Sequence, residues 1–136
     1  MTSREVLVVE DDPVAQLSIW RALLAVDPGL KITCVHSTDS AHQLLADSSR
    51  LKGPFYDLVF CDVMFPSGPD GIDLWRYCKE RYPWLDFVAI SGLAFEEFHK
   101  RYRAEGEWPP FLEKPLSVAA LKKVFDNLYA PEGFQS

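Results

Sequence analysis

The sequence predicts an α/β protein built on one doubly wound parallel sheet of five strands, with helices on both faces. Five short apolar runs alternate along the chain with five segments whose apolar residues recur at helical spacing. The runs are almost continuously apolar, which is typical of strands that are covered on both faces. Five consecutive strand-then-helix units favour a parallel sheet. A chain of 136 residues is long enough to bury the core of one such domain.

The first half of the chain begins with Val6-Leu7-Val8-Val9, an unbroken apolar run. Asp12 followed by Pro13 is typical of a helix start, because the carboxylate caps free amides and proline suits the first helical position. Asp27-Pro28-Gly29 ends that helix, and Gly53-Pro54 interrupts a polar connection further on. The elements expected here are strands at residues 6–9, 30–36 and 58–61 and helices at residues 13–26 and 39–49.

The second half follows the same pattern. Residues 66–71 form a turn-rich loop with two prolines and two glycines, and Pro83 ends the helix that follows this loop. Ser117 is positioned to cap the last helix, whose apolar residues recur at helical spacing. The elements expected here are helices at residues 72–82, 95–102 and 118–128 and strands at residues 87–90 and 111–112. Residues 131–136 are expected to form a tail outside the domain of residues 1–130.

Composition excludes several classes of protein. A net charge of −6 argues against direct nucleic-acid binding, which needs a basic surface. No stretch approaches the length of a membrane span, and residues 1–5 do not resemble a signal peptide. Cys34, Cys61 and Cys78 lack the spacing of a disulfide frame or a zinc site, so we expect reduced core thiols. These features predict a cytoplasmic protein without nucleic-acid or membrane partners.

Polar side chains gather where the predicted strands end. Because ligands of such sheets bind beyond the carboxyl ends of the strands, we expect these residues to share one pocket. Clustered carboxylates favour a hard, oxygen-seeking cation such as Mg²⁺. A lysine and a hydroxyl at the same edge suit an anion, and a phosphoryl group fits both them and the metal. The residues are Glu10, Asp11 and Asp12 after the first strand, Asp62 after the third, Ser91 after the fourth and Lys114 after the fifth, with Asp12 expected to act only as the helix cap.

The ordered set of motifs resembles the receiver domain of two-component response regulators, the CheY-like family. The resemblance covers residues 6–128 and implies a flavodoxin-like fold with strand order 2-1-3-4-5. The motifs are Val6-Leu7-Val8-Val9-Glu10-Asp11-Asp12, Asp57-Leu58-Val59-Phe60-Cys61-Asp62-Val63-Met64-Phe65-Pro66, Asp70-Gly71, Val88-Ala89-Ile90-Ser91-Gly92 and Phe111-Leu112-Glu113-Lys114-Pro115.

The resemblance implies a role for each matching position. Asp62 corresponds to the phosphoacceptor, and Lys114 to the lysine that grips the phosphoryl group. Mg²⁺ would be held by the acidic pair, Asp11 directly and Glu10 through water, together with Asp62 and the backbone carbonyl of Met64. Two further positions correspond to the switch of the family, namely the hydroxyl of Ser91 and the aromatic ring of Phe111.

The function implied is signalling rather than turnover of an external substrate. A sensor histidine kinase or a histidine phosphotransfer protein would donate the phosphoryl group. The surface of the fourth helix, fifth strand and fifth helix would then change and act on a downstream protein or effector domain. The resemblance also allows a homodimer through that surface.

Some features depart from the family pattern, and other functions remain open. The loop at residues 67–69 is one residue longer than usual, Gly92 replaces a frequent alanine, and Phe111 replaces a frequent tyrosine. A receiver-like interaction module that never accepts phosphate is the main alternative. A haloacid-dehalogenase-type phosphatase would need a second aspartate where Met64 stands. A flavin carrier would need a hydroxyl- and glycine-rich loop where the acidic residues 10–12 stand.

Overall fold

The computed structural model describes residues 4–50, 55–63, 65, 70–102 and 107–129. In this part of the chain the strands form one parallel sheet of order β2-β1-β3-β4-β5. The strands are β1 (Glu5–Val9), β2 (Lys31–Val35), β3 (Leu58–Asp62), β4 (Asp86–Ser91) and β5 (Phe111–Glu113). The predicted fold class and the strand order that the resemblance implied are both confirmed.

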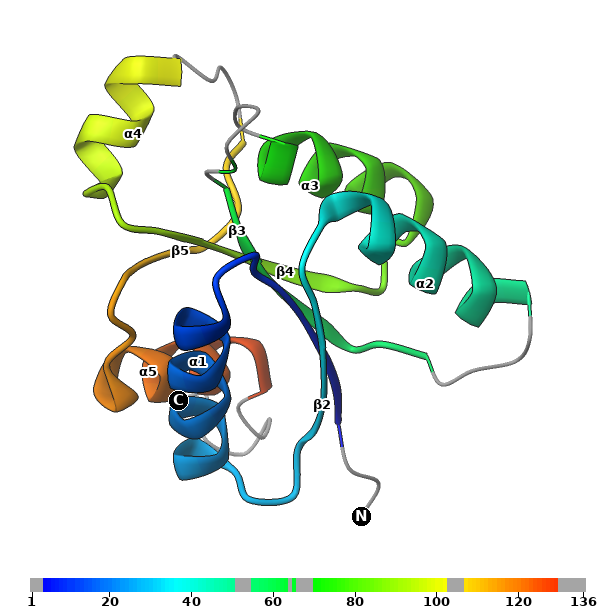
Figure 1. Cartoon of the computed structure of the whole chain (residues 1–136), viewed down its shortest axis with the longest axis horizontal. Coiled ribbons are helices and arrows are strands. Elements are labelled where there is room, and N and C mark those ends of the chain that lie inside the picture. The colour runs from blue at the N-terminus through cyan, green and yellow to red at the C-terminus, as the bar shows by residue number, and fades with distance from the viewer. Residues whose placement is uncertain (1–3, 51–54, 64, 66–69, 103–106, 130–136) are drawn as a thin grey trace, which may run out of the picture.

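Helices cover the two faces of this sheet. They are α1 (Pro13–Val26), α2 (Thr38–Arg50), α3 (Asp70–Arg81), α4 (Phe95–Tyr102) and α5 (Val118–Tyr129). Figure 1 shows α1 and α5 side by side on one side of the sheet and α2, α3 and α4 on the other. None of the helices in the described ranges has the length and apolar character needed to cross a bilayer.

The predicted boundaries differ from the structure by a few residues. Helix α3 begins at Asp70, inside the segment expected to be a loop, and α2 begins one residue early and extends one residue further than expected. The rest of that loop, residues 66–69, lies outside the described residues, as do Met64 and the expected tail at residues 131–136.

Successive side chains of the central strands point to opposite faces of the sheet, so the core is divided into clusters on the two faces. Val6 and Val8 of β1 belong to the cluster beneath α1 and α5, whereas Leu7 and Val9 belong to the cluster beneath α2 and α3. All four side chains are fully buried, which explains why the run is continuously apolar. A third cluster beneath α3 and α4 includes Val63, directly after β3. The sheet is therefore fixed on both sides up to its carboxyl edge.

The predicted helix caps are confirmed. Asp12 Oδ1 accepts a hydrogen bond of 3.2 Å from the amide of Val14 at the start of α1. Ser117 Oγ accepts one of 2.9 Å from the amide of Ala120 at the start of α5. Each bond satisfies an amide that the helix itself leaves without a partner.

The three cysteines are free thiols, but only two are core residues. Cys61 and Cys78 are buried in the cluster beneath α2 and α3, and burial raises the pKa of Cys78 to about 12. The expectation for Cys34 is wrong, because its side chain is exposed. Cys34 lies on β2, an edge strand that pairs with β1 alone and is therefore less covered than the central strands.

Replacing Ser117 by alanine should remove the cap of α5 while leaving its packing unchanged. We expect the free energy of unfolding to fall by about 1 kcal/mol, the usual value of a serine cap. Urea unfolding followed by circular dichroism measures the change. Ser18→Ala, at an exposed position inside α1, is the matched control and should leave stability unchanged or raise it slightly, because alanine is the better helix former. Equal effects of the two substitutions would contradict a capping role for Ser117.

Candidate functional site

The candidate site lies at the carboxyl edge of the sheet, where four strands end. Glu10 and Asp11 directly follow β1, Asp62 ends β3, Ser91 ends β4, and Lys114 directly follows β5. Parallel strands have their carboxyl ends at the same edge, so residues far apart in sequence meet there. Backbone hydrogen bonds continue the pairing beyond the strands.

Those backbone bonds fix the segments that carry the site. The amide of Glu10 donates to the carbonyl of Val35 at 2.9 Å, and the amide of Val63 donates to the carbonyl of Ile90 at 3.0 Å. The amide of Lys114 donates to the carbonyl of Ser91 at 2.8 Å. The ends of β4 and β5 are thus joined within the site itself.

Three carboxylates form a cluster at this edge. One oxygen each from Glu10, Asp11 and Asp62 lies within 4.8 Å of the others. The Glu10 side chain is completely buried and Asp62 is only 4% exposed, whereas Asp11 faces solvent. Three oxygen donors at such spacing could jointly ligate one hard cation.

Lys114 supplies the positive charge of the cluster. Its ammonium lies 2.7 Å from Asp62 Oδ2 and also forms an ion pair with Glu10 Oε1. Burial alone would lower the pKa of Lys114, but its hydrogen bonds to Asp62 and Glu10 outweigh burial and raise the pKa above its ordinary value. The lysine is therefore held in its charged form between two buried carboxylates.

The surroundings of Glu10 strongly perturb its pKa. Burial raises its pKa from 4.5 to about 7, although Lys114 and the amide of Asp12 partly offset this rise by hydrogen bonding to its carboxylate. The negative charge of Asp62 adds to the rise. Gln16 Nε2 donates a 2.6 Å hydrogen bond to the backbone carbonyl of Glu10 and so holds this segment against α1.

Ser91 ends β4, the strand next to β3, whereas Phe111 begins β5 and pairs with Ala89, two residues before Ser91. Ser91 is completely buried, and its Oγ accepts a hydrogen bond of 3.0 Å from the amide of Leu93. Phe111 is partly buried, with its ring centroid 5.6 Å from that of Phe98 in α4. The carbonyl of Met64, expected to be a metal ligand, lies outside the described residues.

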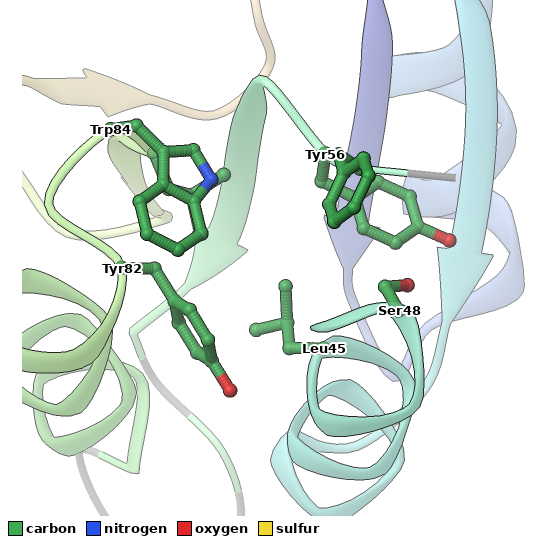
Figure 2. Close-up of a pocket in the computed structure, with 7 residues that line it drawn as sticks. Leu45, Ser48, Tyr56, Tyr82 and Trp84 are labelled. Atoms are coloured by element: carbon green, nitrogen blue, oxygen red, sulfur yellow. The ribbon is translucent and has the colours of Figure 1, made fainter. Parts of the chain in front are cut away.

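A second pocket lies at the opposite edge of the sheet. Figure 2 shows Tyr82 and Trp84 on one side of it and Ser48 of α2 and Tyr56 on the other, with Leu45 of α2 between them. Tyr56 precedes β3 and Trp84 precedes β4, so the pocket lies at the amino ends of these strands. No charged side chain lines it among the described residues. This pocket therefore offers apolar and hydroxyl groups rather than the charged groups found at the carboxyl edge.

Sequence reasoning identified the charged residues of the site but missed two features around them. Gln16 carried no motif signal, although it lies one turn into the helix that follows Glu10. The cis peptide bond between Lys114 and Pro115 was also missed, although an X–Pro bond is where a cis peptide occurs.

The fold and this edge together define a class of protein, the receiver domains of two-component signalling. Residues 6–126 match the sequence family described as the response regulator receiver domain. The chain belongs to this family. It is a receiver domain, and its function is in two-component signal transduction.

Individual relatives agree with this assignment. The sensor kinase CckA of Brucella abortus (strain 2308) is 31% identical over 119 residues. The match covers 88% of this chain but 12% of that kinase, so the chain spans only a small part of the length of this relative.

Solved structures show the same fold. The CheY-like receiver domain from Methylobacillus flagellatus is 26% identical with a TM-score of 0.66, covering 93% of this chain and 99% of that one. A response regulator receiver protein from Sinorhizobium medicae WSM419 is 28% identical with a TM-score of 0.71, covering 93% of this chain and 94% of that one.

The raised pKa of Glu10 predicts how stability depends on pH when divalent cations are removed with a chelator. The folded protein holds the Glu10 proton more tightly than the unfolded chain does, so the free energy of unfolding should fall as pH rises from 4.5 to about 7. Glu10→Gln has no carboxyl group to ionise and should lose this slope.

Urea unfolding of both proteins across this pH range measures the effect. Between about pH 5 and pH 8, the variant should gain on the order of 2 kcal/mol relative to the wild type, since each pKa unit corresponds to about 1.4 kcal/mol. Glu80→Gln changes an exposed carboxylate of α3 and is the matched control, expected to follow the wild-type curve. Parallel curves for the wild type and Glu10→Gln would refute the raised pKa.

Proposed function

We propose that Asp62 accepts a phosphoryl group from the phosphohistidine of a partner protein. The observation that carries this proposal is the contact between the Lys114 ammonium and Asp62 Oδ2 within a cluster of further carboxylates. Asp62 is buried, yet it lies at the carboxyl edge of the sheet, where ligands of such sheets bind. A nucleophilic oxygen, a fixed ammonium and acidic metal ligands are the groups that phosphoryl transfer to a carboxylate requires.

Mg²⁺ fits the donor set of this site. Glu10, Asp11 and Asp62 offer only oxygen atoms, which Mg²⁺ prefers, and Asp11 is exposed enough for the ion to keep several waters. We assign direct coordination to Asp11, Asp62 and the backbone carbonyl of Met64, and coordination through water to Glu10. When bound, Mg²⁺ would neutralise charge on the phosphoryl oxygens.

The transfer step is a displacement at phosphorus. A carboxylate oxygen of Asp62 forms the new O–P bond while the P–N bond to the donor histidine breaks, and the bonding electrons leave with the histidine nitrogen. The protein contributes mainly position and charge, because little other covalent chemistry is needed. Lys114 moves from pairing with carboxylates to pairing with the new phosphoryl oxygens, which carry about −1.5 to −2 charge.

Ser91 and Phe111 would convert this charge into a change of surface. The Ser91 hydroxyl can turn from the amide of Leu93 to donate to the phosphoryl group, which pulls the segment after β4 towards the site. Phe111 packs against Phe98 of α4 and can fill the space that this movement leaves. The phosphoryl group would thereby shift an existing equilibrium between two arrangements of α4, β5 and α5.

The partners that we propose follow from this chemistry. A sensor histidine kinase or a histidine phosphotransfer protein donates the phosphoryl group, and a downstream protein or effector domain, or a second copy of the chain, binds the altered surface. We assign this activity to residues 1–130, acting in the cytoplasm as a signalling unit without turnover of an external substrate.

Asp62→Asn should abolish phosphoryl uptake, because an amide does not replace the carboxylate oxygen as a nucleophile. The measurement is mass spectrometry of the intact protein after incubation with acetyl phosphate and Mg²⁺, in which the wild type should gain one phosphoryl group. Asp57→Asn is the matched control, since Asp57 precedes β3 at the opposite edge of the sheet and should leave uptake unchanged.

The same experiment distinguishes a phosphoacceptor from the main alternative, a receiver-like interaction module that never accepts phosphate. Wild-type protein that stays unmodified with both acetyl phosphate and a phosphohistidine donor would indicate an interaction module that does not depend on phosphorylation. Uptake retained in Asp62→Asn would place the acceptor elsewhere.

Lys114→Ala should preserve Mg²⁺ binding but prevent phosphorylation from changing the surface. The Lys114 ammonium competes with Mg²⁺ for the carboxylates of Glu10 and Asp62. Without it, Mg²⁺ should bind at least as tightly as in the wild type. Amide NMR signals of α4 and β5 should then shift much less on phosphorylation than in the wild type. Lys31→Ala, at an exposed position on β2, is the control. Full shifts in Lys114→Ala would show that the lysine does not couple the two events.

A further inference from the structure

Gly71, the second residue of α3, lies against the backbone at the end of β3. A Cβ atom on this residue would lie 2.4 Å from the carbonyl oxygen of Asp62 and 2.6 Å from Cα of Val63. Both distances are far shorter than van der Waals contact, and both neighbours are backbone atoms that cannot rotate away. The absence of a side chain at Gly71 therefore allows the start of α3 to approach the end of β3 this closely.

The same backbone segment is held from other directions. The Asp62 carbonyl accepts a 3.1 Å hydrogen bond from the Cys61 thiol, and the amide of Val63 donates to Ile90 of β4. Val63 is fully buried in a cluster with Ile72, the residue after Gly71. A side chain at position 71 would therefore displace either the start of α3 or the end of β3.

We infer that Gly71 is a positioning residue that sets the location of the Asp62 carboxylate relative to Glu10 and Asp11. The inference rests on the proposed function, because it concerns the same metal and phosphoryl site. Gly71 does not contact the ligand itself. It acts through the backbone of Asp62 and Val63, whose position fixes where the carboxylate of Asp62 projects.

The geometric demands of different cations make this inference testable. Mg²⁺ requires nearly octahedral oxygens at about 2.0–2.1 Å, whereas Ca²⁺ accepts irregular sets of oxygens at about 2.3–2.6 Å. Displacing one ligand should therefore weaken Mg²⁺ binding more than Ca²⁺ binding. General loss of stability would not change the ratio of the two affinities in folded protein.

The experiment compares Gly71→Ala with Gly92→Ala in the full chain. Gly92 is the matched control, because a Cβ there would meet no atom within 4 Å. Mg²⁺ and Ca²⁺ are titrated separately against tryptophan fluorescence and amide NMR spectra. We expect Gly71→Ala to weaken Mg²⁺ binding by about tenfold or more and Ca²⁺ binding by less, since small misplacements in such sites are costly. Gly92→Ala should keep the wild-type ratio.

A stabilising co-solvent and a second variant allow the inference to be tested even if Gly71→Ala does not fold in buffer. If Gly71→Ala is not folded in buffer, the titrations are made in trimethylamine oxide, which favours the folded state. Ile72→Val loosens the packing of the start of α3 against Val63 without introducing a clash. It should therefore weaken Mg²⁺ binding relative to Ca²⁺ binding, by a smaller factor than Gly71→Ala. A wild-type ratio in both variants would overturn the inference. A wild type that binds no Mg²⁺ would instead refute the proposed function.

Discussion

The site depends on one electrostatic arrangement, the ammonium of Lys114 placed between the carboxylates of Glu10 and Asp62. Two buried negative charges at this spacing repel each other and would be costly without a compensating cation. Lys114 provides that compensation and keeps the site assembled. The compensation is partial, since the pKa of Glu10 remains raised to about 7. The cluster therefore retains an affinity for further positive charge, which suits it to bind a divalent ion.

The topology of the sheet makes this arrangement possible. The chain crosses from β1 to β2 on one side and returns to β3 on the other, so the loops after β1 and β3 diverge to opposite faces and leave an open edge between them. The lysine arrives from β5, two strands away from β3, and its backbone amide bonds to the Ser91 carbonyl. Lys114 thus both compensates the charge of the carboxylates and joins the ends of β4 and β5.

Much of this was predictable from the sequence because it follows from local patterns. Continuous apolar runs predicted the strands, and Asp12 and Ser117 predicted two helix starts. The convergence of Glu10, Asp62 and Lys114 was predictable once the sheet was expected to be parallel. The carboxyl ends of parallel strands lie at one edge, so residues that follow these ends must meet there.

Other features depend on distances that no local pattern encodes. The Asp70-Gly71 motif was visible, but the contact of Gly71 with the backbone of Asp62 requires the packing of α3 against β3. The pairing of Lys114 with Glu10 in addition to Asp62 depends on the path of the chain after β5. Cys34 was expected in the core because cysteine is commonly buried, and its exposure reflects the incomplete cover of an edge strand.

The shortness of β5 has a consequence for local motion. This strand has three residues, lies at the edge of the sheet and pairs with β4 alone. Elements with so few backbone bonds open at a lower free energy than the central strands, without global unfolding. The residue that balances the acidic cluster is therefore attached to one of the most easily detached parts of the sheet. Transient fraying of this edge would carry the ammonium away from its carboxylates and briefly leave them for a solvent cation.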